Sequence, residues 1–77
     1  SFFFRNKSEN KSKIFRRSIF TTKDIKKGEK FSKDNIRVIR PGYGLAPKYF
    51  NRILNKKSPI NIKNSEPVKS IILKKLN

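Results

Sequence analysis

The chain has 77 residues and a formal net charge of +16, from 21 basic and 5 acidic residues, and it contains no cysteine and no histidine. A chain of this length has room for one small domain, and no apolar run approaches the ~20 residues that a membrane-spanning helix needs. We therefore expect a soluble, cytoplasmic protein. Without thiols or imidazoles the chain can form no thiolate nucleophile, imidazole base or Cys/His metal site, so we expect no catalytic residue, cofactor or metal of its own.

The first fifteen residues differ from the rest of the chain. Three phenylalanines at positions 2–4 precede a polar stretch, residues 5–13, that has no hydrophobic residue. Such a composition cannot bury enough apolar surface to offset the conformational entropy of folding. We therefore expect residues 1–15 to form a linker or tail, with the phenylalanines left at a boundary, and residues 16–77 to form the domain.

Short apolar segments separated by turns make up the next part of the chain. Residues 18–22 have the β-branched and aromatic composition of a strand, and Gly28 can take the positive φ of a tight turn. Ser32 can accept backbone N–H groups at the start of a single helical turn. Residues 37–40 again favour a strand, which Pro41 ends. The pattern predicts a mostly β domain with short helical turns.

One clear helix is predicted over residues 46–54. Pro47 suits the first position of a helix, where its missing N–H is not needed. Four apolar residues then recur at helical spacing, namely Tyr49, Phe50, Ile53 and Leu54. Asn55 tolerates the left-handed conformation that ends many helices, so we expect the helix to stop there.

The end of the chain repeats an earlier pattern. Residues 25–31 and 62–68 align at an offset of 37 (62 − 25), with apolar, turn and glutamate positions matched. Two such halves, each too small to bury its own apolar face, predict packing about a pseudo-twofold axis. Segments 59–62, 66–68 and 71–73 are expected to form short strands and a closing turn.

The loop over residues 40–45 is the candidate binding site, with the sequence Arg-Pro-Gly-Tyr-Gly-Leu. The Arg40 guanidinium is a rigid fork of donors that stays charged and can orient a carbonyl oxygen. Pro41, Gly42 and Gly44 would shape the loop and let the backbone approach a ligand closely. The alternative for such an arginine is a solvated side chain beside an ordinary turn.

Four motifs in order carry a family resemblance: Arg-Arg-Ser-Ile-Phe at 16–20, Lys-Asp-Ile-Lys-Lys-Gly-Glu at 23–29, Ile-Arg-Pro-Gly-Tyr-Gly-Leu at 39–45 and Pro-Lys-Tyr at 47–49. Together they resemble the SAF, or antifreeze-like, domain that ends bacterial sialic, legionaminic and pseudaminic acid synthases. The resemblance implies a compact β-clip fold with an internal pseudo-twofold. The last two motifs look more like pseudaminic-type synthases than N-acetylneuraminate synthases, although the sequence leaves open which nonulosonic acid is made.

The resemblance also implies a function. In this family a (β/α)₈ barrel binds phosphoenolpyruvate, a divalent metal and an N-acetylated amino sugar, and condenses the two substrates to a nine-carbon keto acid with release of phosphate. The SAF domain crosses the homodimer and closes over the partner's barrel, where the Arg of its Arg-Pro-Gly motif hydrogen-bonds the acetamido oxygen of the sugar. That role falls on Arg40, with Tyr43 as a weaker second candidate. The chain alone is therefore expected to be a non-catalytic part of a synthase.

Two positions depart from the family pattern. Asn55 stands where glycine usually follows the helix, which is a mild change because asparagine tolerates left-handed geometry. Ser65 stands where the second turn usually has glycine, so the second half is expected to mirror the first less closely.

Two other classes of function remain open at this stage. A basic nucleic-acid-binding module would use aromatic rings that lie among lysines, namely Phe15, Phe20, Tyr43, Tyr49 and Phe50. Most of these rings fall at core-like spacings, which argues against it. An ice-binding protein would share the fold of type III antifreeze proteins, but needs a flat, largely uncharged surface that 21 basic residues disfavour.

Overall fold

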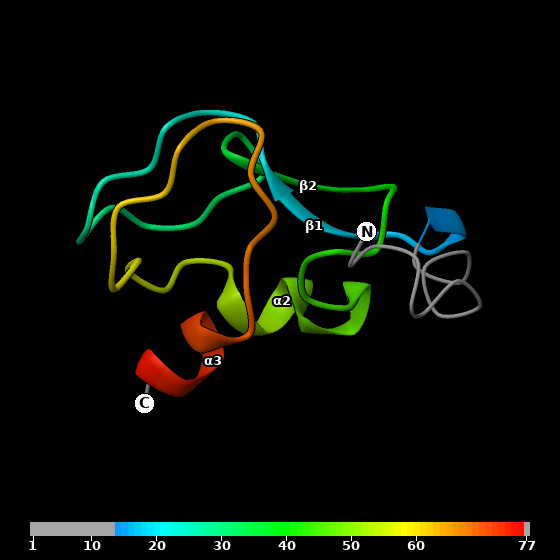
Figure 1. Ribbon diagram of the computed structural model, residues 1–77. Helices are drawn as coiled ribbons and strands as arrows, with labels where there is room; N and C mark the ends of the chain where they lie inside the picture. The colour runs from blue at the N-terminus through cyan, green and yellow to red at the C-terminus, as the bar shows by residue number, and fades with distance from the viewer. Residues whose placement is uncertain (1–13, 77) are drawn as a thin grey trace, which may run out of the picture.

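The structure is a computed structural model that describes residues 14–76. Strand β1 (Ser18–Thr21) pairs antiparallel with β2 (Ile36–Ile39), and a 3-10 turn η2 (Pro47–Tyr49) leads into α2 (Phe50–Ile53). The chain then returns through long turns to α3 (Ile71–Lys75). The sheet and the crossing turns lie on one side, and the two short helices lie on the other (Figure 1). The tail predicted for residues 1–15 lies, up to residue 13, outside the described residues.

A single core cluster joins these elements. Its buried members come from both strands, the turns and both helices: Ile19, Ile25, Phe31, Ile36, Leu45, Ile53, Ile62, Val68 and Ile72. The helix predicted over residues 46–54 is confirmed, because Pro47 begins η2 and Ile53 is fully buried. Asn55 follows with φ 69°, the predicted left-handed residue. The Ser32 turn is confirmed as well, since the Ser32 hydroxyl accepts the Asp34 N–H at 3.2 Å.

The predicted pseudo-twofold is visible in the backbone hydrogen bonds. Ile25 and Ile62, which the offset of 37 equates, exchange both of their N–H···O bonds at 2.7 Å. Other bonds occur in pairs whose donors and acceptors both differ by 37: Gly28 N to Ser58 O with Ser65 N to Thr21 O, and Phe31 N to Lys56 O with Val68 N to Ile19 O. The first half (residues 18–36) and the second half (residues 55–73) therefore pack about an axis between Ile25 and Ile62.

The second turn copies the first despite its different residue. Gly28 has φ 92° and Ser65 has φ 64°, so both adopt left-handed geometry at equivalent places. Serine keeps this conformation because the hydrogen bonds of its own N–H and of the Glu66 N–H to Thr21 hold the turn. The weaker mirror expected from Ser65 is therefore not observed.

The prediction of a strand-like closing turn at residues 71–73 is wrong, because α3 occupies this place. Ile72 is buried, and Leu73 and Leu76 pack against the core, which is the spacing of one helix face. The counterparts of residues 71–73 in the first half are residues 34–36, of which Ile36 begins β2, and β2 has β1 beside it. Residues 55–58, the counterparts of β1, make only one β-bridge, through Lys57, so a strand at 71–73 would lack a partner. The segments 59–62 and 66–68 likewise contribute single bridges, through Ile62 and Pro67.

Candidate functional site

The loop of residues 40–45 is anchored by one buried hydroxyl. Ser18, the first residue of β1, is 1% exposed, and its Oγ donates to the carbonyl oxygen of Pro41 at 2.7 Å. The Ser18 Oγ also accepts a hydrogen bond from the Gly44 N–H, at 3.0 Å. Because Ser18 lies opposite Ile39 at the end of β2, the sheet register places this hydroxyl beneath the loop. Both ends of the loop are therefore fixed by a single side chain.

Gly44 packs where no side chain fits. A Cβ at this position would overlap the carbonyl oxygen of Ile19 and lie 3.1 Å from the backbone of Val68. The next residue, Leu45, is buried and links the two halves, since its carbonyl accepts the Ile19 N–H at 2.9 Å and its N–H donates to Val68 at 2.8 Å. Close packing, and not positive φ, is thus the reason for glycine at position 44.

Arg40 follows β2 and is exposed to solvent. Its Nε donates to the carbonyl oxygen of Phe15 at 2.9 Å, and Phe15 is the second of the described residues. A guanidinium has five N–H donors, so this bond occupies one of them. The bond orients the plane of the guanidinium while its terminal nitrogens remain at the surface. The peptide bond from Arg40 to Pro41 is cis, and Pro41 and Gly42 are half-buried.

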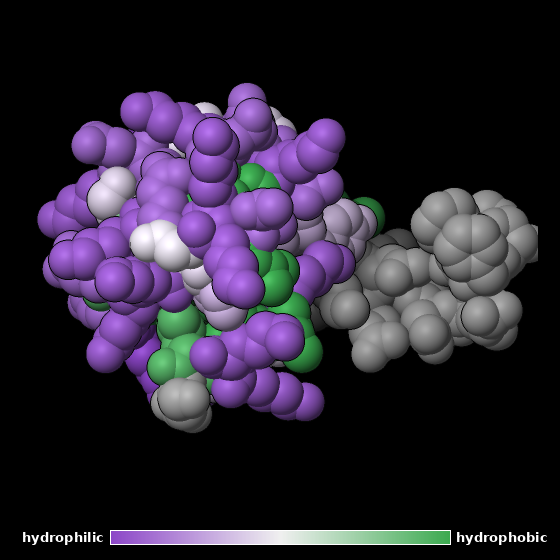
Figure 2. Space-filling model, turned by 90° about the vertical axis from the view of Figure 1, so that its left-hand side faces the viewer, coloured by the Kyte–Doolittle hydropathy of each residue, from purple (hydrophilic) through white to green (hydrophobic). Residues whose placement is uncertain are grey.

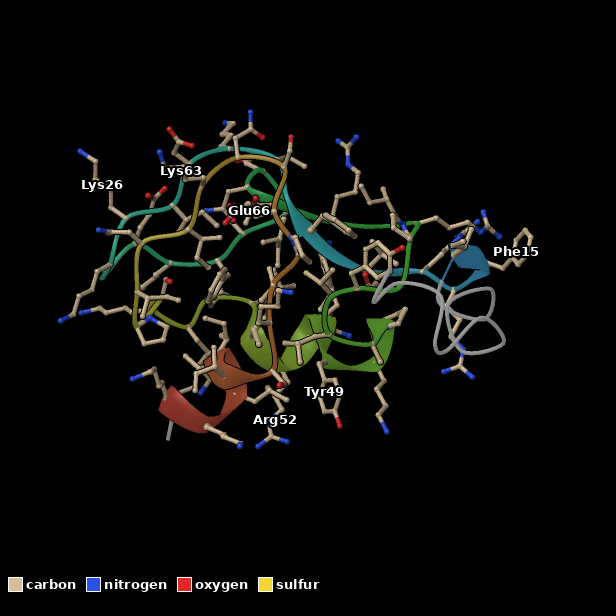
Figure 3. All side chains as sticks on the ribbon, in the orientation of Figure 1. Phe15, Lys26, Tyr49, Arg52, Lys63 and Glu66 are labelled. Atoms are coloured by element: carbon tan, nitrogen blue, oxygen red, sulfur yellow. The ribbon has the colours of Figure 1, made fainter. Side chains whose placement is uncertain are left out.

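Several exposed apolar side chains belong to the same segments as Arg40 and its partner Phe15. Phe15, whose carbonyl it contacts, is 72% exposed, and Tyr43 on the same loop is 48% exposed. The adjacent Ile39 and the nearby Ile14 are exposed as well. Figure 3 shows Phe15 at the end of the molecule opposite Lys26. By contrast, hydrophilic side chains cover most of the face shown in Figure 2. Exposed apolar side chains near a charged donor are typical of a contact surface.

The predicted site residues occupy one loop, and one contributor was missed. Arg40 and Tyr43 are both exposed on this loop, with Pro41, Gly42 and Gly44 in its backbone. Ser18 was not predicted, because a serine at the start of a strand is ordinary and its role depends on the pairing of β1 with β2. Of the aromatic rings considered for nucleic-acid stacking, three are buried or pack against the core, namely Phe20, Tyr49 and Phe50.

The loop offers binding chemistry in the form of donors and apolar contacts. Within residues 14–76 no group of three or more acidic, histidine or cysteine side chains could hold a metal ion. In the same described part of the chain, no helix is long and apolar enough to cross a bilayer.

Comparisons with known proteins show which family the chain resembles. The SAF domain model matches residues 16–70. The chain is 44% identical over 59 residues to pseudaminic acid synthase of Campylobacter jejuni subsp. jejuni serotype O:2, covering 77% of this chain and 17% of the relative. It is 40% identical over 62 residues to pseudaminic acid synthase of Helicobacter pylori, covering 80% of this chain and 18% of that protein.

A solved structure agrees with these relatives. The crystal structure of the spore coat polysaccharide biosynthesis protein SpsE from Bacillus subtilis superposes with a TM-score of 0.70 at 35% identity, over 83% of this chain and 19% of that one. The chain thus spans less than a fifth of the length of these proteins. The family resemblance seen in the sequence is confirmed. Because the SAF domain model matches most of the chain, this protein belongs to the SAF domain family.

Proposed function

We propose that this chain is the sugar-recognising domain of a nonulosonic acid synthase, and that Arg40 contacts the substrate. The observation that carries the proposal is the fixed loop. Ser18 and Leu45 hold it to both halves of the core, and it presents an exposed guanidinium. The names of the Campylobacter and Helicobacter relatives, both pseudaminic acid synthases, support the class of substrate.

The ligand of Arg40 is the acetamido group of an N-acetylated amino sugar. A carbonyl oxygen of this kind only accepts hydrogen bonds, and a guanidinium only donates them. Since the loop is already fixed before the sugar arrives, the loop loses little conformational entropy when Arg40 binds the sugar. Tyr43, exposed on the same loop, is the second expected contact.

The condensation itself belongs to a (β/α)₈ barrel outside this chain. That barrel would bind phosphoenolpyruvate and a divalent metal, and this domain would close over the barrel of the other subunit in a homodimer. The apolar side chains around Arg40, Phe15 and Ile39 among them, would be buried on docking and exclude water from the sugar. The domain thus contributes one oriented donor to a pocket whose other walls lie elsewhere.

The test is Arg40→Ala in a synthase that carries this chain as its SAF domain. Hydrogen bonds to charged groups contribute about 1.5–3 kcal/mol, so kcat/KM for the amino sugar should fall about 10- to 100-fold while KM for phosphoenolpyruvate changes little. Arg37→Ala is the matched control, because Arg37 is also exposed and lies three residues away on β2. Equal activity in the two variants would refute the role of Arg40.

A further inference from the structure

A hollow on the pseudo-twofold axis is a second candidate site, independent of the Arg40 loop. Its volume is about 280 Å³. Three residues of the first half and their three counterparts line it: Asp24, Ile25 and Lys26 with Asn61, Ile62 and Lys63. Figure 3 places Lys26 and Lys63 at the end of the molecule opposite Phe15. This volume lies just below the usual range of ligand sites, so the hollow suits only a small ligand.

The floor and rim of this hollow are fixed by hydrogen bonds. Ile25 and Ile62 are buried and bond to each other through both backbone groups, which gives a rigid apolar floor. On the rim, Asp24 Oδ1 accepts the Asn64 N–H at 2.8 Å, and Asn61 Oδ1 accepts the equivalent Lys27 N–H at 2.7 Å. Asp24 and Asn61 therefore make the same bond in the two halves, each to a turn of the other half.

The side chains above this floor have complementary chemistry. Lys26 and Lys63, one from each half, line the hollow, and an ammonium group attracts an anion. The second carboxylate oxygen of Asp24 only accepts hydrogen bonds, so it repels a bare anion but binds a hydroxyl group. The amide N–H groups of Asn61 donate from the opposite rim.

We propose that this hollow binds a small anion that also carries hydroxyl groups, in the class of sugar phosphates and sugar acids. The lysines bind the phosphate or carboxylate, Asp24 accepts from a hydroxyl, and the C–H face of the ring packs on Ile25 and Ile62. The proposal does not depend on the function of Arg40, because no residue is shared between the two sites.

The binding test is an NMR titration of the 77-residue chain at about 0.15 M salt, where long-range attraction to the basic surface is screened. Four probes are compared: glucose 6-phosphate, glucuronate, inorganic phosphate and glucose. Saturable shifts of the amides of residues 24–26 and 61–63 are expected with one or both of the first two probes, at affinities at least about fivefold above those of the last two. The tighter of the two identifies phosphate or carboxylate as the preferred anion. Inorganic phosphate binding as tightly as both would overturn the proposal, as would the absence of saturable shifts with either.

Variants locate the binding. Exposed ion pairs contribute about 0.2–1 kcal/mol, so Lys26→Gln and Lys63→Gln should each weaken binding about two- to fivefold, and to a similar extent. The control, Lys33→Gln with Lys75→Gln, removes two exposed charges that do not line the hollow. An equal loss in the control would show general attraction to a basic surface and refute the site.

Asp24→Asn separates a site for hydroxylated anions from a plain anion site. Asparagine preserves the bond to the Asn64 N–H, since Asn61 makes the equivalent bond already. Removing the carboxylate relieves its repulsion of bare phosphate and weakens its bond to the sugar hydroxyl. The preference for the hydroxylated anion over inorganic phosphate should therefore fall about two- to fivefold. An unchanged or larger preference would contradict the role of Asp24.

Discussion

The two halves of this domain share their turns and differ in the element that each turn leads into. The turns at Gly28 and Ser65 both have a left-handed residue, and the N–H of that residue donates to the carbonyl of the equivalent residue in the other half, Ser58 or Thr21. After the first turn the chain enters β2, and after the second it enters α3. β2 leads into the loop that carries Arg40, whereas α3 covers the core with Ile72. The hollow on the axis is built from the parts that the halves share, whereas the Arg40 loop comes from the part that occurs once.

The largest expected loss of stability comes from the core, where Phe31 of the first half and Val68 of the second are equivalent and both fully buried. Phe31→Ala should cost about 3–5 kcal/mol, which is near the whole stability of so small a domain. Val68→Ala removes fewer carbons and should cost about 1.5–3 kcal/mol. Circular dichroism in water should therefore show the Phe31 variant largely unfolded and the Val68 variant still folded. Equal losses would mean that the two positions contribute alike.

Gly44→Ala tests the junction between the halves. The added methyl group meets the backbone of Ile19 and Val68, neither of which can swing aside as a side chain would. The free energy of unfolding should fall by about 2–3 kcal/mol, the upper part of the range for overpacking. Urea denaturation measures this fall, and a loss below that of an exposed substitution such as Lys33→Ala would contradict the packing described.

Exchanging the two turn residues sharpens the comparison of the turns. Left-handed geometry costs a residue with a side chain roughly 1–2 kcal/mol, so Gly28→Ser should destabilise by about that amount. Ser65→Gly relieves the same strain but adds flexibility to the unfolded chain, at about 0.4–1 kcal/mol, which leaves a gain of roughly 0–1.6 kcal/mol. Thermal unfolding should show a lower melting temperature for Gly28→Ser and a higher one for Ser65→Gly.

The smallest effect is expected for Arg40→Ala in the isolated domain. Arg40 is exposed, and its bond to Phe15 lies at the edge of the structure. Surface substitutions of this kind change stability by no more than about 0.5 kcal/mol. An unchanged melting temperature would show that any loss of synthase activity in this variant comes from the missing guanidinium. A large fall would instead make Arg40 a structural residue.

Local signals in the sequence predicted the elements that local chemistry determines. Pro47 and the apolar spacing after it predicted the helix, and the offset of 37 predicted the pseudo-twofold, whose axis the structure places between Ile25 and Ile62. The segment at 71–73 was missed because its β-branched isoleucines favour a strand, while the absence of a strand to pair with decides for a helix.

The position of the candidate loop could be predicted, but its support could not. Arg40 was identified from its motif alone, whereas the Ser18 anchor depends on the register of two strands. Similarly, the Phe15 carbonyl that orients Arg40 falls within the segment predicted to be a linker. Contacts between residues distant in sequence carry no local signal, so only the structure reveals them.

The exchange of bonds between Ile25 and Ile62 has the form of an isologous dimer contact, in which a residue on the axis meets its own copy. Here a covalent connection, residues 37–54, makes that contact intramolecular and so raises the effective concentration of each half for the other. The Arg40 loop lies within this connection. Its exposed residues Arg40 and Tyr43 can therefore change without altering the contact between Ile25 and Ile62, whereas Gly44 and Leu45 contact both halves.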